Sequence, residues 1–268
     1  MYDDDITAAD SSARPGPSAT PPRPVVAFFD VDNTLLRGAS IYHLGRGARK
    51  HGLLGFRDLV RFGWHQARFI AVGENGRHLT GVRERALQIV EGISEAELAS
   101  IAEGVYDEYI APRLWPESVE LAREHLRQGH AVWLITATPI VIAEVMAARL
   151  GLSGALGTRI ESIDGVFTGR LLGPVLHGPV KARAATELAD RLGSDLSDCW
   201  AYSDSSNDVP LLELVGNRAV VNPDRALARH ALEQGWETIR LDPASIRHAQ
   251  RRMRREVRRH RGNKKRQP

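Results

Sequence analysis

Residues 25–34 read Val-Val-Ala-Phe-Phe-Asp-Val-Asp-Asn-Thr, and this segment indicates both the fold and the position of a functional site. Its β-branched and aromatic residues predict a short buried strand. The strand ends in two carboxylates, Asp30 and Asp32, followed by Thr34. Ligands of open α/β sheets bind at the carboxyl ends of the strands. We therefore expect a functional site directly after this strand.

The spacing of the two acids points to a metal. Asp30 and Asp32 are one residue apart, and two carboxylates held close together repel each other. A hard cation such as Mg²⁺ takes oxygen ligands and supplies the compensating charge. The spacing therefore favours a site for a hard cation such as Mg²⁺.

A helical pattern follows for about eighty residues, without a convincing strand. The expected helices cover residues 40–50, 55–72, 79–90 and 95–109. Ser94 and Glu97 have the spacing of a capping box, which favours a helix start there. Because this block separates the first strand from the second, we expect an inserted all-helical cap over the carboxyl edge of the sheet.

Helices and strands alternate from residue 113 onwards. The expected strands are 131–135, 155–160, 200–203, 218–221 and 238–241, and the expected helices are 116–128, 139–150, 179–192, 208–215 and 224–234. Asp164-Gly165 predicts a hairpin over residues 163–167, because Asp-Gly favours primed turns. This alternation implies an α/β fold with a Rossmann-like, mostly parallel sheet covered on both faces.

Four polar residues stand at corresponding places in the later elements. Thr136 and Asp204 each follow a predicted strand, Asp208 comes four residues after Asp204, and Lys181 lies in the first turn of a helix. Alone, each has an ordinary explanation as a turn former, a helix cap or a solvated side chain. Their joint order and spacing favour a site assembled from distant parts of the chain.

These residues fall into four motifs that resemble those of the haloacid dehalogenase superfamily of phosphohydrolases. The motifs are, in order, Asp30-Val31-Asp32-Asn33-Thr34, Leu134-Ile135-Thr136, Lys181, and Ser203-Asp204-Ser205-Ser206-Asn207-Asp208. A helical block between the first two motifs is similar to the subgroup that contains phosphoserine phosphatases. The resemblance covers about residues 25–242.

The resemblance implies a chemical role for five residues. Asp30 would be the nucleophile that forms an aspartyl-phosphate. Asp32 would protonate the leaving group and later activate water. Thr136, Lys181 and Asn207 would bind and neutralise the phosphoryl oxygens.

It also implies a metal site and a use for the helical block. Mg²⁺ would be held by Asp30, Asp204 and the main-chain carbonyl of Asp32, with Asp208 in support. The helical cap would exclude bulk water and recognise the leaving group.

The chain departs from the phosphoserine phosphatase pattern in two places. Those enzymes carry a glutamate shortly after the first motif, where residues 35–40 here read Leu-Leu-Arg-Gly-Ala-Ser, and glycines after the second motif, where Ala137-Thr138-Pro139 stands here. Arg83 or Arg85 could match the cap arginine that binds a substrate carboxylate, although a helix-surface arginine is the alternative. We expect a related phosphatase whose substrate need not be phosphoserine.

The composition is that of an ordinary soluble domain. The chain has 268 residues, 43% hydrophobic and 26% charged, and lacks an apolar run long enough for a membrane span. The acidic N-terminus has no apolar signal segment, and the single cysteine, Cys199, cannot form an intrachain disulfide. We expect a cytoplasmic protein.

The charge is unevenly distributed. Residues 247–268 contain eleven Lys or Arg and one acid, Glu256, a balance of +10, and subtracting this from the whole-chain +3 leaves −7 for residues 1–246. Such a tail could contact nucleic acid or an anionic membrane surface, or it could simply be a solvated extension.

Together these inferences divide the chain into a disordered leader (1–24), a catalytic core (25–36 and 113–246), a helical cap (37–112) and a basic tail (247–268). The predicted activity is Mg²⁺-dependent hydrolysis of a small phosphomonoester. Two alternatives stay open. One is a phosphotransferase that uses the same intermediate, and the other is a nucleic-acid or anionic-membrane binding protein that uses the tail.

Overall fold

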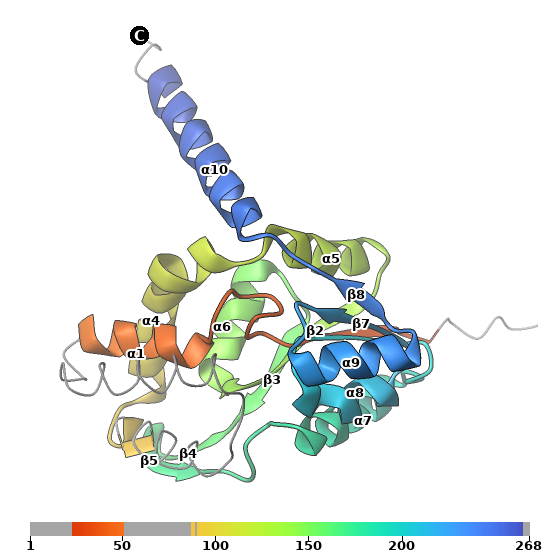
Figure 1. The fold of residues 1–268 in the computed structure, drawn as a ribbon. Helices are drawn as coiled ribbons and strands as arrows, with labels where there is room; N and C mark the ends of the chain where they lie inside the picture. Colours follow the sequence, from red (N-terminus) through yellow and green to blue (C-terminus); the bar gives the residue numbers. More distant parts are fainter. Residues whose placement is uncertain (1–22, 51–86, 89, 265–268) are drawn as a thin grey trace, which may run out of the picture.

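The computed structural model describes residues 23–50, 87–88 and 90–264 (Figure 1). At its centre lies a six-stranded sheet in the order β3-β2-β1-β6-β7-β8, with every neighbouring pair parallel. The strands are β1 (Val26–Phe29), β2 (Ala131–Pro139), β3 (Gly154–Thr158), β6 (Trp200–Ser203), β7 (Asn217–Val221) and β8 (Glu237–Ile239). The predicted α/β fold is confirmed.

Strand β1 lies in the middle of the sheet, where both its faces and both its edges are covered. All four of its side chains are fully buried, and β1 pairs with β2 on one side and β6 on the other. A strand in that position is apolar at every residue instead of alternating. Burial of Phe28 and Phe29 contributes about 1.5–3 kcal/mol each.

The side chains of β1 alternate between two hydrophobic layers. Ala27 and Phe29 pack in the layer that includes residues of α5 (Pro116–Arg127) and α6 (Ile140–Leu150). Val26 and Phe28 pack in the layer formed with α7 (Pro179–Leu192), α8 (Val209–Leu214) and α9 (Arg225–Gln234). Figure 1 shows α7, α8 and α9 together on one side of the sheet. The polar groups of the site therefore emerge at a strand end and not from a face.

Of the described helices between β1 and β2, α1 (Ser40–Lys50) and α4 (Glu95–Val105) belong to the predicted cap, and α5 follows them in the core. The cap at Ser94 is as predicted, since its side chain accepts from the N–H of Glu97. The predicted helix over 95–109 is too long, because the chain changes to a π-helical turn (Tyr106–Ile110) and a 3-10 turn (Ala111–Arg113). The predicted helix over 55–72 and most of the one over 79–90 lie outside the described residues, and the 37–112 domain stays a prediction.

A two-stranded hairpin joins the later half of the chain to this inserted block. β4 (Ile160–Ile163) and β5 (Val166–Leu171) are connected by Asp164 and Gly165, which both have positive φ as a primed turn requires. Phe167 exchanges backbone hydrogen bonds with the 92–93 segment, at 2.9 Å each. The strand predicted over 155–160 covers most of β3 but runs on into the first residue of β4.

The C-terminal basic segment is one long helix, α10 (Pro243–Lys264), which runs away from the body (Figure 1). Its first turns are anchored by Ser245, which donates to Glu117, and by Gln250, which donates to the carbonyl of Pro112. The helix therefore begins four residues before the predicted tail and includes most of it. Nowhere in the described part of the chain is a helix long and apolar enough to cross a membrane.

Candidate active site

The end of β1 places Asp30 at the carboxyl edge of the sheet. Its N–H donates to the carbonyl of Tyr202 at 3.0 Å, so the residue still belongs to the β1–β6 ladder. The chain then turns sharply through Asn33, which has a φ of 57°. Asparagine tolerates this left-handed conformation better than most residues. The N–H of Gly38 donates to Asn33 Oδ1 at 3.0 Å and closes the turn.

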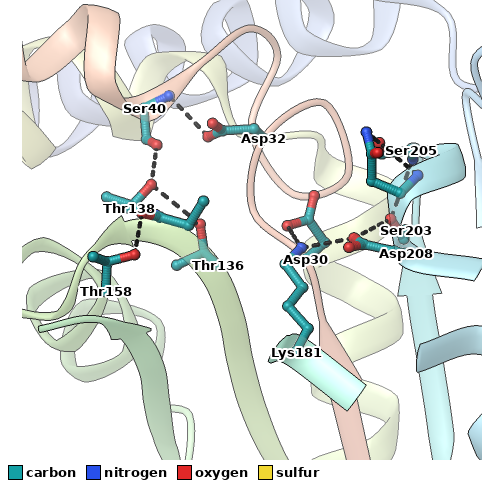
Figure 2. Close-up of polar contacts among 12 residues, drawn as sticks. Asp30, Asp32, Ser40, Thr136, Thr138, Thr158, Lys181, Ser203, Ser205 and Asp208 are labelled. Carbon is teal, nitrogen blue, oxygen red and sulfur yellow. Dashed lines mark hydrogen bonds and ion pairs between the residues drawn. The ribbon is translucent and has the colours of Figure 1, made fainter. Parts of the chain in front are cut away.

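A buried lysine joins three elements at this edge (Figure 2). Lys181 Nζ lies 2.7 Å from Asp30 Oδ1 and 2.6 Å from Asp208 Oδ2. Ser203 Oγ donates to the same Asp208 oxygen at 2.7 Å. Lys181 is 3% exposed and Asp208 1%. The structure therefore brings together the predicted residues Asp30, Lys181 and Asp208, which lie far apart in the sequence.

The charges of this cluster depend on one another. Burial opposes the ammonium charge of Lys181, but Asp30 and Asp208 outweigh it and raise the lysine pKa. Burial raises the pKa of Asp30 to about 7 against the attraction of Lys181, and the neighbouring carboxylates of Asp208 and Asp32 add to the rise. One lysine thus leaves negative charge at this edge only partly balanced.

Asp204 adds a further carboxylate. Burial raises its pKa well above the ordinary value, the charge of Asp30 raises it further, and a hydrogen bond from Asn33 opposes the rise. Asp208 Oδ1 is buried without a hydrogen-bond partner among the described residues. Carboxylates that repel one another fit a divalent cation, which takes oxygen ligands and supplies the missing charge.

Within the described residues, no three acidic, histidine or cysteine side chains converge into a ready-made metal cluster. The predicted ligand set would not form such a cluster, because it contains only two of these side chains, Asp30 and Asp204, and its third member is the main-chain carbonyl of Asp32. All three donors are oxygen atoms, as Mg²⁺ prefers. The repulsion that raises the pKa of Asp204 also favours a cation there.

A second set of contacts holds Asp32 (Figure 2). Its Oδ1 accepts from the N–H of Ser40, the first residue of α1, at 2.8 Å. The Ser40 hydroxyl is hydrogen-bonded to the hydroxyl of Thr138. Burial raises the pKa of Asp32, while hydrogen bonds from Ser40 lower it. The two aspartates of the first motif thus have different partners, Lys181 for Asp30 and Ser40 for Asp32.

Thr136 lies within an extended strand and not after one, which corrects the predicted end of β2. The regular pairing of β2 with β3 is interrupted between Ile135 and Pro139. Within this irregular stretch the hydroxyl of Thr136 accepts from the N–H of Thr138 at 3.2 Å and donates to its Oγ1 at 3.1 Å. Local hydroxyl bonds thus accompany the interruption in the ladder.

Three predicted residues remain, and one of them, Asn207, lies in the described part of the chain. The main-chain N–H and the side-chain amide of Asn207 both donate to Ser205 Oγ, at 3.3 and 3.1 Å, so its role at the phosphate stays a prediction. Arg83 and Arg85 lie outside the described residues.

Three residues in these contacts were not among the predicted site residues. Ser203 donates to Asp208, Ser40 donates to Asp32, and Thr138 is hydrogen-bonded to Ser40. Ser203 is the last residue of a strand and Ser40 the first of a helix. Only Ser203, which directly precedes Asp204 at the end of β6, carried a signal in the sequence.

Comparison with known families agrees with this geometry. The model of the haloacid dehalogenase-like hydrolases matches residues 27–213, which include the four motifs. The chain belongs to the haloacid dehalogenase-like hydrolases. Within this family it is a phosphatase similar to phosphoserine phosphatases.

Relatives by sequence and by structure were found. A phosphoserine phosphatase of Mycobacterium tuberculosis is 48% identical over 233 residues, which cover 87% of this chain and 74% of that protein. A Bordetella pertussis protein of unknown function has a TM-score of 0.71 at 29% identity, over 81% of this chain and 99% of that one. A phosphoserine phosphatase structure has a TM-score of 0.58 at 18% identity, over 81% and 94% of the two chains, and shows the shared fold.

The first prediction concerns the charge balance of this hydrolase site. Replacing Lys181→Met leaves Asp30 and Asp208 buried without their cation, and we expect a loss of about 3–5 kcal/mol in the free energy of unfolding near neutral pH. Denaturant titration of the metal-free protein measures this loss.

The loss should depend on pH in a defined direction. The pKa of Asp30 is about 7 in the folded protein against 3.8 ordinarily, so the stabilising contribution of protonated Asp30 is fully present below about pH 4 and is lost as pH rises through 7. Above that pH the buried carboxylate is charged and depends on the ammonium group of Lys181. Lys181→Met should therefore cost more at about pH 8 than at about pH 5. The control is Lys50→Met, which removes an exposed lysine paired with Glu108 and should leave stability near the wild-type value. A pH-independent loss would contradict this charge assignment.

Proposed function

We propose that this protein hydrolyses a small phosphomonoester through an aspartyl-phosphate on Asp30, with Mg²⁺ as its cofactor. The observation that carries the proposal is the buried contact of Lys181 with Asp30 and Asp208 at the carboxyl edge of the sheet. A lysine there can neutralise a phosphoryl oxygen and orient the carboxylate that attacks it. Membership of the family and the similarity to a phosphoserine phosphatase support the same chemistry.

The reaction divides into two displacements at phosphorus. In the first, an oxygen of Asp30 forms a bond to phosphorus while the bond to the substrate oxygen breaks. Asp32 donates its proton to that departing oxygen, and an alcohol leaves. In the second, Asp32 takes a proton from water, the water oxygen bonds to phosphorus, and the carboxylate of Asp30 is released with inorganic phosphate.

Separate partners suit these separate tasks. Asp30 must be ionised to attack; burial raises its pKa to about 7, and the ammonium of Lys181 opposes that rise and favours the ionised form. Asp32 must carry a proton at the start, and burial, which raises its pKa, favours that form. Thr136 would bind another phosphoryl oxygen, and doing so would require its hydroxyl to release Thr138.

Mg²⁺ would be held by Asp30, Asp204 and the main-chain carbonyl of Asp32, with Asp208 in support. When bound, it supplies positive charge that reduces the repulsion between a phosphate dianion and Asp30. This assignment rests on the mutual repulsion of the carboxylates and on the family pattern.

The substrate class follows from the family and from the departures. We propose a small phosphorylated metabolite whose leaving group is recognised by the inserted residues 37–112, which would close over the site as a cap. Without the glutamate of phosphoserine phosphatases, the substrate need not carry an ammonium group. A phosphotransferase would use the same first displacement and pass the group to another alcohol.

We propose a cytoplasmic setting, in keeping with the single buried and free Cys199.

The test is phosphate release from a panel of phosphomonoesters, with and without Mg²⁺. The panel includes phosphoserine, sugar phosphates, glycerol phosphate and nucleoside monophosphates. We expect Mg²⁺-dependent turnover that falls by at least about 10³-fold in Asp30→Asn, because the amide cannot act as nucleophile.

The matched control is Asp190→Asn, which makes the same change at an exposed position of α7 and should keep wild-type turnover. Turnover that survives in Asp30→Asn, or that does not respond to Mg²⁺ after chelation, would contradict the proposal. Transfer of phosphate to an added alcohol in preference to water would favour the phosphotransferase.

The basic helix supports a second, separate function, which is binding to a polyanion. α10 contains nine Lys or Arg and one acid, and Arg251, Arg252 and Arg255 are exposed beyond its anchored turns. The helix offers little apolar surface for a membrane, so we propose nucleic acid as the partner. The catalytic residues lie in other elements, and turnover should not depend on this contact.

Fluorescence anisotropy with a labelled duplex tests this. Replacing Arg251, Arg252 and Arg255 by Gln should weaken binding at least about tenfold and reduce its salt dependence, with turnover unchanged. The control replaces Arg183, Arg225 and Arg229, exposed on α7 and α9, by Gln and removes the same charge from the body. Equal loss in both variants, or tighter binding to anionic vesicles than to the duplex, would contradict this role.

A further inference from the structure

The two places where this chain departs from the phosphoserine phosphatase pattern meet in one buried contact. Ser40 ends the 35–40 segment that lacks the glutamate, and Thr138 stands in the segment that lacks the glycines. Their hydroxyls are hydrogen-bonded to each other (Figure 2). Ser40 is 0% exposed and Thr138 4%. A glycine at position 138 has no side chain and could not form this contact.

Ser40 connects this contact to Asp32. It is the first residue of α1, and an N–H at a helix start has no acceptor within its own helix. Here the carboxylate of Asp32 supplies that acceptor, at 2.8 Å from the nitrogen. One serine therefore holds Asp32 through its main-chain N–H, with a further hydrogen bond from its side chain, and also contacts β2 through its hydroxyl.

Thr138 connects the same contact to the second motif. Its Oγ1 accepts from the hydroxyl of Thr136 at 3.1 Å, and its N–H donates to Thr136 at 3.2 Å. The hydroxyls thus form a continuous path from Asp32, at the turn after β1, to the irregular stretch of β2. Buried hydrogen bonds of this kind fix the relative position of the elements that they join.

We propose that Ser40 and Thr138 are positioning residues that hold Asp32 where it can protonate the leaving group. Without the hydroxyl bridge, the first turn of α1 loses its polar tie to β2, and the N–H that fixes Asp32 moves with it. Small displacements of a catalytic group lower rates strongly, since proton transfer needs hydrogen-bond distance. The inference rests on the proposed role of Asp32 in phosphomonoester hydrolysis.

The test measures how the rate depends on the leaving group. A good leaving group such as p-nitrophenolate departs without a proton, whereas phenolate and alkoxides increasingly need one. For Ser40→Ala and Thr138→Val, kcat/KM should fall about tenfold more for phenyl phosphate and glycerol phosphate than for p-nitrophenyl phosphate. Asp32→Asn should show the same pattern to a greater degree.

Two control variants lose a hydroxyl elsewhere. Ser153→Ala removes the acceptor for the N–H of Val132 at the far end of β2, and Thr186→Val removes a hydroxyl that donates within α7. Both should keep the wild-type dependence on the leaving group. An equal fall for all three esters in Ser40→Ala or Thr138→Val, or no fall at all, would overturn the inference.

A thermal-unfolding cycle on the free protein distinguishes failure of the bridge from failure of the proposed function. If the two hydroxyls form one interaction, the double variant should melt little below the less stable single variant. Additive losses would overturn the bridge even in an active enzyme. A coupled cycle in a wild-type protein that hydrolyses none of the esters would instead refute the proposed function, and with it the positioning role.

Discussion

The site depends on one buried ammonium group. Lys181 lies between Asp30 and Asp208, and each of the three side chains would be costly to bury without the others. This cluster lies at the carboxyl edge of the sheet, where a phosphate dianion could add still more negative charge. We interpret the cluster as a site built for an incoming anion and a cation, and not as a device for stability.

The fold supplies the rigidity that this charge network needs. Asp30 continues a central strand with apolar layers on both faces, so the carboxylate is presented from a strand whose four side chains are all fully buried. Lys181 arrives from the first turn of α7, and Asp208 from the turn that starts α8. Three separately packed elements thus meet at one point. Asp32 lies just beyond the strand, where the hydrogen bond from Ser40 can set its position independently of the contact between Lys181 and Asp30.

Much of this could be predicted from the sequence. The apolar run of β1, the alternation of elements and the order of the acids predicted the parallel sheet and placed Asp30, Lys181 and Asp208 at one edge. Side-chain hydroxyl contacts were beyond reach, because Ser40 and Thr138 are 98 residues apart and nothing in their local patterns pairs them. The irregular pairing at Thr136 was also missed, since a threonine after an apolar run is equally typical of a strand end.

If Asp30 carries the phosphoryl group during turnover, the covalent intermediate can be trapped on it. Asp32→Asn should form the intermediate from p-nitrophenyl phosphate, whose leaving group needs no proton, but should lack the base for its hydrolysis. The Mg²⁺-loaded variant would be mixed with this ester, denatured in acid and reduced with borohydride, which converts an aspartyl-phosphate to homoserine. We predict homoserine at position 30, absent without substrate. Release of nitrophenolate with an unmodified Asp30, or with the modification at another residue, would contradict this prediction.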